Sequence, residues 1–260
     1  MKKHTFTTFA LAALTAFITT TAHAALIEGT EQGDVLIGQD DDNINNPEIQ
    51  PPGTVADQSL QDADVMLGNG GNDVMIGLLG NDVMHGGPGK DIMIGGTEGG
   101  SPAGTLKSDV MFGDEGNDIS IWAGGDGNDA FLGGPGSRDA LVFGTIDREN
   151  GIPTLTEPVQ GYPHGVPTAD VSGQNAFCEV ERVSDESLLG YDFLVRFISK
   201  ATGNLIVTVR VDDEVEQVFC TSETAAAIAF ADLTDEHPQF EIVTLDEVRQ
   251  LNRKVALIIR

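Results

Sequence analysis

Residues 64–95 read DVMLGNGGN DVMIGLLGN DVMHGGPGK DIMIG, and this stretch decides the fold. Aspartate returns every nine residues, at Asp64, Asp73, Asp82 and Asp91, and a short apolar run and a glycine follow it each time. A glycine-rich bend then leads to the next aspartate. A fixed short period of bend plus strand is typical of units that stack along one axis. The stretch therefore predicts a solenoid of parallel β-strands.

The pattern continues on both sides of this stretch, and it is expected to cover residues 25–144. Residues 46–61 and 95–108 break the spacing and contain prolines, so we expect them to be loops that leave the solenoid. The further aspartates at the same repeat position are Asp34, Asp42, Asp109, Asp118, Asp129 and Asp139. The repeat region is therefore one array in several pieces.

The residue two places after each aspartate is expected to point into the solenoid, because side chains alternate along a strand. These residues are Leu36, Ile44, Met66, Met75, Met84, Met93, Met111, Phe131 and Leu141. A row of methionines can bind a soft metal. Core filling is the better interpretation here, because the same position also accepts Leu, Ile and Phe. Ser120 departs from the pattern, which leaves open a one-residue shift of the strand at 119–123.

Bends one full turn apart lie on the same edge of the solenoid, so the aspartates should form two stacks. One stack is expected to contain Asp73, Asp91, Asp118 and Asp139, and the other Asp64, Asp82, Asp109 and Asp129. Two carboxylates about 4 Å apart repel by roughly 4 kcal/mol at an effective dielectric constant near 20. A divalent cation between the turns would reverse the sign of this interaction.

Calcium suits such a bend, because it takes six to eight oxygen ligands in irregular geometry. Carboxylates and main-chain carbonyls exposed at glycine supply both kinds of oxygen. We therefore expect Ca²⁺ between the turns, with metal binding and folding as one event. The predicted metal residues are Asp34, Asp64, Asp73, Asp82, Asp91, Asp109, Asp118, Asp129, Asp139, Gly71, Gly80, Gly87, Gly89, Gly116, Gly125 and Gly127. The full glycine bend is missing before Asp42, Asp64 and Asp109.

A family resemblance follows from two complete nonapeptides. Residues 86–94 and 124–132 match the pattern Gly-Gly-x-Gly-x-Asp-x-hydrophobic-x, and 68–73 and 113–118 are close variants. The region 29–144 thus resembles the repeats-in-toxin (RTX) or hemolysin-type calcium-binding family. The resemblance implies a right-handed parallel β-roll with calcium between its turns. It implies nothing about residues 176–260.

The N-terminus predicts a Sec signal peptide over residues 1–24. Lys2 and Lys3 precede an apolar stretch, and Ala22-His23-Ala24 is a small-x-small cleavage site. Many members of the resembled family instead use a type I route with a C-terminal signal. The mature chain is expected to be exported, with an extracellular location favoured over the periplasm. The formal net charge of −27 argues against nucleic acid and anionic membranes as partners, and no other segment predicts a membrane span.

The second half differs in composition. Residues 145–175 are rich in proline and predict a linker or meandering loop, and 176–260 predict a small α+β domain. Strands are expected at 177–183, 191–199, 205–211 and 215–220, and helices at 222–233 and after the capping box that begins at Thr244. That last helix would place Val248, Leu251 and Val255 on one face. Cys178 and Cys220 predict a disulfide in an exported protein, with two buried thiols as the alternative.

No catalytic motif stands out in the chain. His-Glu-x-x-His and Gly-x-Ser-x-Gly are absent from the sequence, and His85 is expected to point outward from its strand. We therefore expect a non-enzymatic exported calcium-binding protein, with 176–260 as a cap on the last turn. The alternative is a calcium-stiffened adhesin or recognition protein, whose C-terminal domain binds a protein or glycan. A hydrolase of unrecognised type is a third hypothesis.

Overall fold

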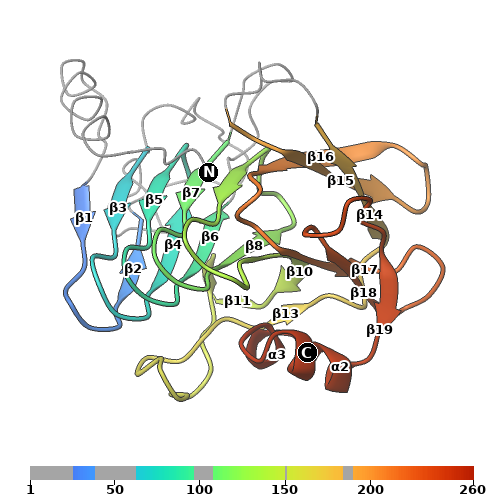
Figure 1. Ribbon diagram of the computed structural model, residues 1–260. Coiled ribbons are helices and arrows are strands. Elements are labelled where there is room, and N and C mark those ends of the chain that lie inside the picture. The colour runs from blue at the N-terminus through green and yellow to red at the C-terminus, as the bar shows by residue number, and fades with distance from the viewer. Residues whose placement is uncertain (1–25, 39–62, 97–107, 150, 184–189) are drawn as a thin grey trace, which may run out of the picture.

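The computed structural model describes residues 26–38, 63–96, 108–149, 151–183 and 190–260 (Figure 1). The predicted signal peptide, Asp42, Ile44 and most of the two loops that interrupt the repeats lie outside these residues. Within the described part, no helix has the length and apolar composition needed to cross a bilayer.

The repeats form two facing sheets of parallel strands, and successive strands alternate between them. The first sheet contains β1 (Leu26–Glu28), β3 (Val65–Leu67), β5 (Val83–His85), β7 (Val110–Phe112) and β9 (Ala130–Leu132). The second contains β2 (Val35–Ile37), β4 (Val74–Leu78), β6 (Ile92–Gly96), β8 (Ile119–Ala123) and β10 (Ala140–Ile146). Equivalent positions pair in register, as in Met66↔Met84 and Met75↔Met93. The parallel strands of the described repeats are therefore consistent with the predicted β-roll.

The residues that face inward from both sheets form one core. Met66, Met75, Met84 and Met93 are each 0% exposed, so the methionines fill the interior as predicted. The suspected strand shift at Ser120 is wrong. Ser120 pairs with Met93 on one side and Leu141 on the other, and it is buried at the inward position. Its hydroxyl lies 3.5 Å from the Met111 sulfur, which gives the buried oxygen a weak partner.

Both sheets continue beyond the repeats into the C-terminal half. In the first sheet, β16 (Leu205–Val211) runs parallel to β9, and β15 (Phe193–Ser199) and β14 (Ala176–Arg182) follow it. In the second, β17 (Gln217–Thr221) runs parallel to β10, and β18 (Ile228–Asp232) and β19 (Glu241–Val243) follow. The strands share their core with the repeats. The repeats and the C-terminal half thus form continuous sheets.

The helix expected at 222–233 is wrong, because β18 occupies its second half. The alanine-rich run favours helix locally, but pairing with β17 and β19 on both sides overrides that preference. The capping box is present at Thr244, and it begins α2 (Leu245–Leu251). That helix ends at Asn252, so Val255 belongs to a separate short helix, α3 (Val255–Ile258).

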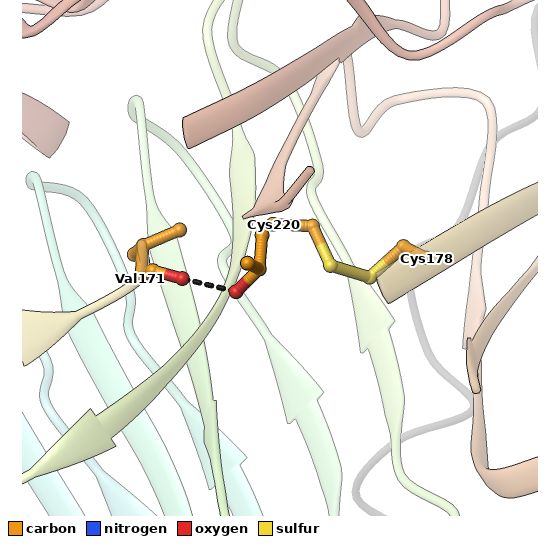
Figure 2. Close-up of a disulfide and its surroundings, with 4 residues drawn as sticks. Val171, Cys178 and Cys220 are labelled. Atoms are coloured by element: carbon orange, nitrogen blue, oxygen red, sulfur yellow. Dashed lines mark hydrogen bonds between the residues drawn. A yellow bond between two sulfur atoms is a disulfide. The ribbon is translucent and has the colours of Figure 1, made fainter. Parts of the chain in front are cut away.

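The predicted disulfide is confirmed between Cys178 and Cys220 (Figure 2). It joins β14, the outer strand of the first sheet, to β17 in the second. Beside it, the Thr221 hydroxyl donates a hydrogen bond to the Val171 carbonyl (Figure 2). The two sheets are therefore covalently tied at the C-terminal end of the roll, which is typically worth about 2–4 kcal/mol for a disulfide.

Residues 145–175, predicted as a linker, contain little regular structure but pack closely against the rest of the protein. This segment contains β11 (Arg148–Glu149), β12 (Ile152–Pro153) and β13 (Ala169–Asp170). Tyr162 and Val166 in its central loop are 3% and 1% exposed and belong to the core outside the second sheet. The segment therefore lies against the roll as a cover.

Candidate metal centre

The bends that lead from the first sheet to the second form one regular edge of the roll, here called edge I. They comprise residues 29–34, 68–73, 86–91, 113–118 and 133–139. Each ends in an aspartate, and in the first four bends the main-chain N–H of this aspartate donates to the Oδ1 atom of the aspartate one turn further on. The N–O distances are 2.7 Å for Asp34–Asp73, 2.8 Å for Asp73–Asp91, 2.7 Å for Asp91–Asp118 and 2.5 Å for Asp118–Asp139.

The opposite edge, edge II, has the same ladder. Asp64 donates to Asp82 at 2.7 Å, Asp82 to Asp109 at 2.7 Å, and Asp109 to Asp129 at 3.0 Å. The aspartates thus fall into the two stacks that the nine-residue period predicted. From Asp64 to Asp139 these side chains are at most 1% exposed.

The second carboxylate oxygen is what makes edge I a candidate metal site. The Oδ2 atoms of Asp73, Asp91, Asp118 and Asp139 are buried without a hydrogen-bond partner. A buried carboxylate oxygen in this state is costly unless a cation or proton satisfies it. Each aspartate of the stack therefore has one oxygen in the ladder and one available for a metal.

Main-chain carbonyl oxygens meet these carboxylates at the first glycine of each bend. A Cβ atom on Gly68 would lie 2.7 Å from Asp73 Oδ2 and 2.3 Å from the Gly86 oxygen. A Cβ atom on Gly113 would lie 2.8 Å from Asp118 Oδ2 and 2.4 Å from the Gly133 oxygen. Only glycine leaves space there, and the atoms nearest to that space are mainly oxygens. This donor set fits Ca²⁺.

The sites differ from a cluster of acidic side chains. Among the described residues, no group of three or more Asp, Glu, His or Cys side chains converges closely enough to hold a metal. At Gly68, Gly86 and Gly113, one carboxylate oxygen of the bend meets one main-chain carbonyl oxygen of the next bend. Calcium accepts such sets, whereas zinc and softer metals prefer nitrogen and sulfur.

Burial raises the pKa of the edge I carboxyl groups. The pKa of Asp73 rises to about 6, that of Asp118 to about 7, and those of Asp91 and Asp139 to about 8. Desolvation is the main cause in each case, and the ladder hydrogen bonds oppose it. Near neutral pH, the metal-free stack therefore tends to retain protons that Ca²⁺ would displace.

Edge I is covered from outside by a strap, which we define as residues 159–165 together with 252–254. Figure 1 shows the two parts of the strap below the repeat strands: the first belongs to the yellow loop, and the second joins the red helices α2 and α3. The strap contacts the residue before the aspartate in four successive bends. These contacts are Asn72 Nδ2 to the Gly161 oxygen (2.9 Å), Tyr162 OH to the Lys90 oxygen (2.6 Å), Lys254 Nζ to the Asn117 oxygen, and Asn252 Nδ2 to the Arg138 oxygen (3.2 Å). The strap explains why the stack is buried, and no sequence motif indicated it.

Lys254 brings a positive charge to this edge. Its ammonium group interacts with Asp118, Asp91 and Asp139, and burial lowers its pKa to about 8. The strap therefore carries a cation of its own beside the carboxylates.

Two predicted metal positions are less suited to calcium than their sequence indicated. Asp34 is not enclosed, and its Oδ2 accepts hydrogen bonds from the Thr30 N–H (2.6 Å) and hydroxyl (2.8 Å). The complete nonapeptide with Gly125, Gly127 and Asp129 lies on edge II, where the Trp122 indole donates to the Asp126 and Gly127 oxygens, both at 3.1 Å. At both positions, protein donors already satisfy oxygens that the sequence assigned to the metal.

The other predicted glycines support the stacked bends. Gly71, Gly89 and Gly116 are linked by parallel bridges across three turns. Gly80 and Gly87 have φ angles of 133° and 86°, which other residues rarely adopt. His85 lies on the outer side of its strand as predicted, stacked on Phe112 and 3.1 Å from Asp114. It therefore takes no part in the edge I stack.

Comparison with known families agrees with this geometry. Residues 62–98 and 103–119 match the model of the RTX calcium-binding nonapeptide repeat, with four copies. The match covers about a fifth of the chain and confirms the resemblance predicted from the bends. These repeats bind Ca²⁺. Comparison with curated proteins and with solved structures found no match.

Proposed function

From these RTX calcium-binding repeats, we propose that the chain is an exported, non-enzymatic protein whose β-roll orders around calcium. The observation that carries this proposal is the row of buried Oδ2 atoms on Asp73, Asp91, Asp118 and Asp139, which no protein donor satisfies. Calcium held by these carboxylates and by the neighbouring glycine carbonyls would stabilise the stacked turns. Export is supported by the signal-peptide pattern in the sequence of residues 1–24 and by the disulfide.

Calcium binding and folding should be strongly coupled. The donor oxygens of one site come from successive turns, so the site exists only when those turns are stacked. Without metal, stacking buries carboxyl groups that must hold protons or remain charged in an apolar interior. An unfolded chain avoids this cost. Calcium therefore favours the ordered roll by binding to it alone.

The C-terminal half would act as the cap of the roll. β16 and β17 cover β9 and β10, the last strands of the repeat region, and thereby protect their backbone groups and apolar side chains. The disulfide between β14 and β17 holds this cap together across the two sheets. Its role in the proposal is to end the solenoid on one side.

A calcium titration of the mature chain (residues 25–260) tests the proposal. Far-UV circular dichroism should show a gain of β structure on addition of Ca²⁺ to protein in chelator, and equilibrium dialysis should count several bound ions. Magnesium serves as the control, because it demands a compact octahedral site with few carbonyl ligands. Equal β content in chelator and in calcium, with no ion bound, would contradict the proposal.

Recognition of another molecule is the second candidate function. Leu205 and Ile206, at the start of β16, are 55% and 52% exposed although both are large and apolar. An exposed apolar pair of this kind can mark a contact surface. If the protein is a calcium-stiffened adhesin, substitution of this pair by serine should abolish binding to a surface or glycan array and leave calcium binding unchanged.

A further inference from the structure

The roll makes one more turn after the last repeat, and a sequence without repeat character builds it. β16 pairs with β9 through Val211↔Phe131, and β17 pairs with β10 through Gln217↔Ala140. The segment that joins them, Asp212–Glu216, therefore lies on edge I directly beyond the bend at 133–139. It contains no glycine, and the matched repeats at 62–98 and 103–119 do not extend to it.

Glu216 takes the place that an aspartate has in every earlier turn. The Asp139 N–H donates to Glu216 Oε2 at 2.7 Å, as Asp91 donates to Asp118 at 2.7 Å. Glu216 also directly precedes its strand, in register with Asp139. A carboxylate thus continues the ladder into the C-terminal half.

The main chain of this segment reproduces the carbonyl of a repeat bend. The Glu214 oxygen would lie 2.5 Å from a Cβ atom on Gly133, and the Gly133 oxygen lies 2.4 Å from the same point on Gly113. The Cβ atom of Asp139 lies 3.0 Å from that point on Gly133, as the Cβ atom of Asp118 does on Gly113. The carbonyl of Glu214 and the side chain of Asp139 therefore meet over Gly133.

One oxygen at this junction lacks a partner. Asp139 is 0% exposed, and its Oδ1 accepts the hydrogen bond from Asp118, while its Oδ2 has no hydrogen-bond donor. A Cβ atom on Gly136 would lie 2.3 Å from this Oδ2 and 2.3 Å from the Gly116 oxygen, so the Asp139 carboxylate lies inside its own bend, with the preceding bend beside it. An oxygen enclosed in this way calls for a bound cation.

We propose that the junction between the last repeat bend and Asp212–Glu216 is a further calcium site, formed by the Asp139 carboxylate, the Glu216 carboxylate and the Glu214 carbonyl. All the donors are oxygen, which selects a hard divalent cation. The site joins the repeats to the C-terminal half, so the ion holds the cap in place on the roll. This inference rests on the proposed calcium binding of the repeats and extends it to residues outside them.

The test compares Glu216→Gln with Asp213→Asn in the mature chain. The glutamine at 216 keeps an oxygen that can accept the Asp139 N–H and removes only the charge. Asp213 is exposed in the same segment and supplies no donor to the proposed site, so its variant, which removes the same charge, is the matched control. Bound calcium is counted by equilibrium dialysis, and hydrogen exchange of residues 205–221 is followed with and without calcium.

We expect Glu216→Gln to bind one ion fewer than the wild type and to lose the calcium-dependent protection of residues 205–221, while the repeats stay protected. Asp213→Asn should behave as the wild type. If Glu216→Gln binds as many ions as the wild type, with 205–221 still protected, the junction site does not exist and the repeat sites stand. If the wild type binds no calcium, both the junction site and the proposed function fail.

Discussion

Asp91→Asn should stabilise the metal-free protein and reduce the stability that calcium adds to it. The amide keeps an oxygen that accepts the Asp73 N–H, so the ladder is retained. It replaces the unpartnered Oδ2 by a group that cannot bind a cation. The substitution therefore separates the role of the carboxylate in the metal site from its role in the fold.

The size of the metal-free effect follows from the pKa. Burial raises the pKa of Asp91 from 3.8 to about 8, and a tenfold change in proton affinity corresponds to about 1.36 kcal/mol. At pH 7.4 the unfolded chain has this group ionised, so folding without metal costs about 5 kcal/mol at this residue. Asparagine does not have that cost. When the calcium concentration is a hundred times the dissociation constant, loss of one site removes about 2.7 kcal/mol of the stability that calcium adds.

Urea unfolding measures both effects, with circular dichroism in chelator and in calcium. An osmolyte such as trimethylamine oxide in both buffers supports the metal-free fold enough to give a transition. Asp34→Asn is the control, because Asp34 begins the same ladder through its main-chain N–H and its carboxylate is satisfied by Thr30. Its variant should gain no stability in chelator. If Asp91→Asn is less stable than the wild type in both buffers, burial of the Asp91 carboxylate does not destabilise the metal-free fold, and the argument fails.

Three further predictions concern pH, the strap and the bends. The metal-free fold should gain stability as the pH falls from 8 to 5, because the edge I carboxyl groups have pKa values of about 6 to 8 when folded and near 3.8 when unfolded. Calcium affinity should weaken over the same pH range, and a pH series of unfolding with and without chelator measures both effects. Lys254→Met should tighten calcium binding about fivefold in a calorimetric titration, because it removes an ammonium group, held at the Asn117 carbonyl, that repels the ion by an energy on the order of 1 kcal/mol. Unchanged affinity would show that this charge lies too far from the ion. Gly89→Ala should lower the free energy of unfolding in urea by about 3 kcal/mol, because its Cβ atom would lie 1.6 Å from the Gly71 oxygen. Gly124→Ala is the control and should change it little, because no described atom lies within 4 Å of its Cβ atom.

The repeat region could be predicted because its period fixes its neighbours. Once Asp73 and Asp91 are one turn apart, their pairing, the inward position of Met75 and the two stacks follow from geometry alone. The loops between the repeats did not disturb this, since Asp82 still pairs with Asp109. Periodic sequence therefore predicts both the fold and most of the carboxylates of the site.

The cover and the last turn could not be predicted in this way. Tyr162 and Lys254 are single residues in irregular segments, and their contacts with edge I depend on where the chain returns in space. The turn at Asp212–Glu216 lacks glycine and carries Glu216 in place of aspartate, so no repeat pattern marks it. The strand at β18 was missed because pairing with two neighbours outweighed the helical preference of alanine.

Hydrogen exchange of the repeat region, with and without calcium, tests the coupling of metal and fold most directly. The amides of Asp73, Asp91 and Asp118 donate to the next carboxylate only when the turns are stacked. We predict slow exchange of residues 63–96 and 108–145 in calcium and exchange close to that of an unfolded chain in chelator at pH 7.4. Equal protection in both conditions would contradict the proposal that calcium orders the roll.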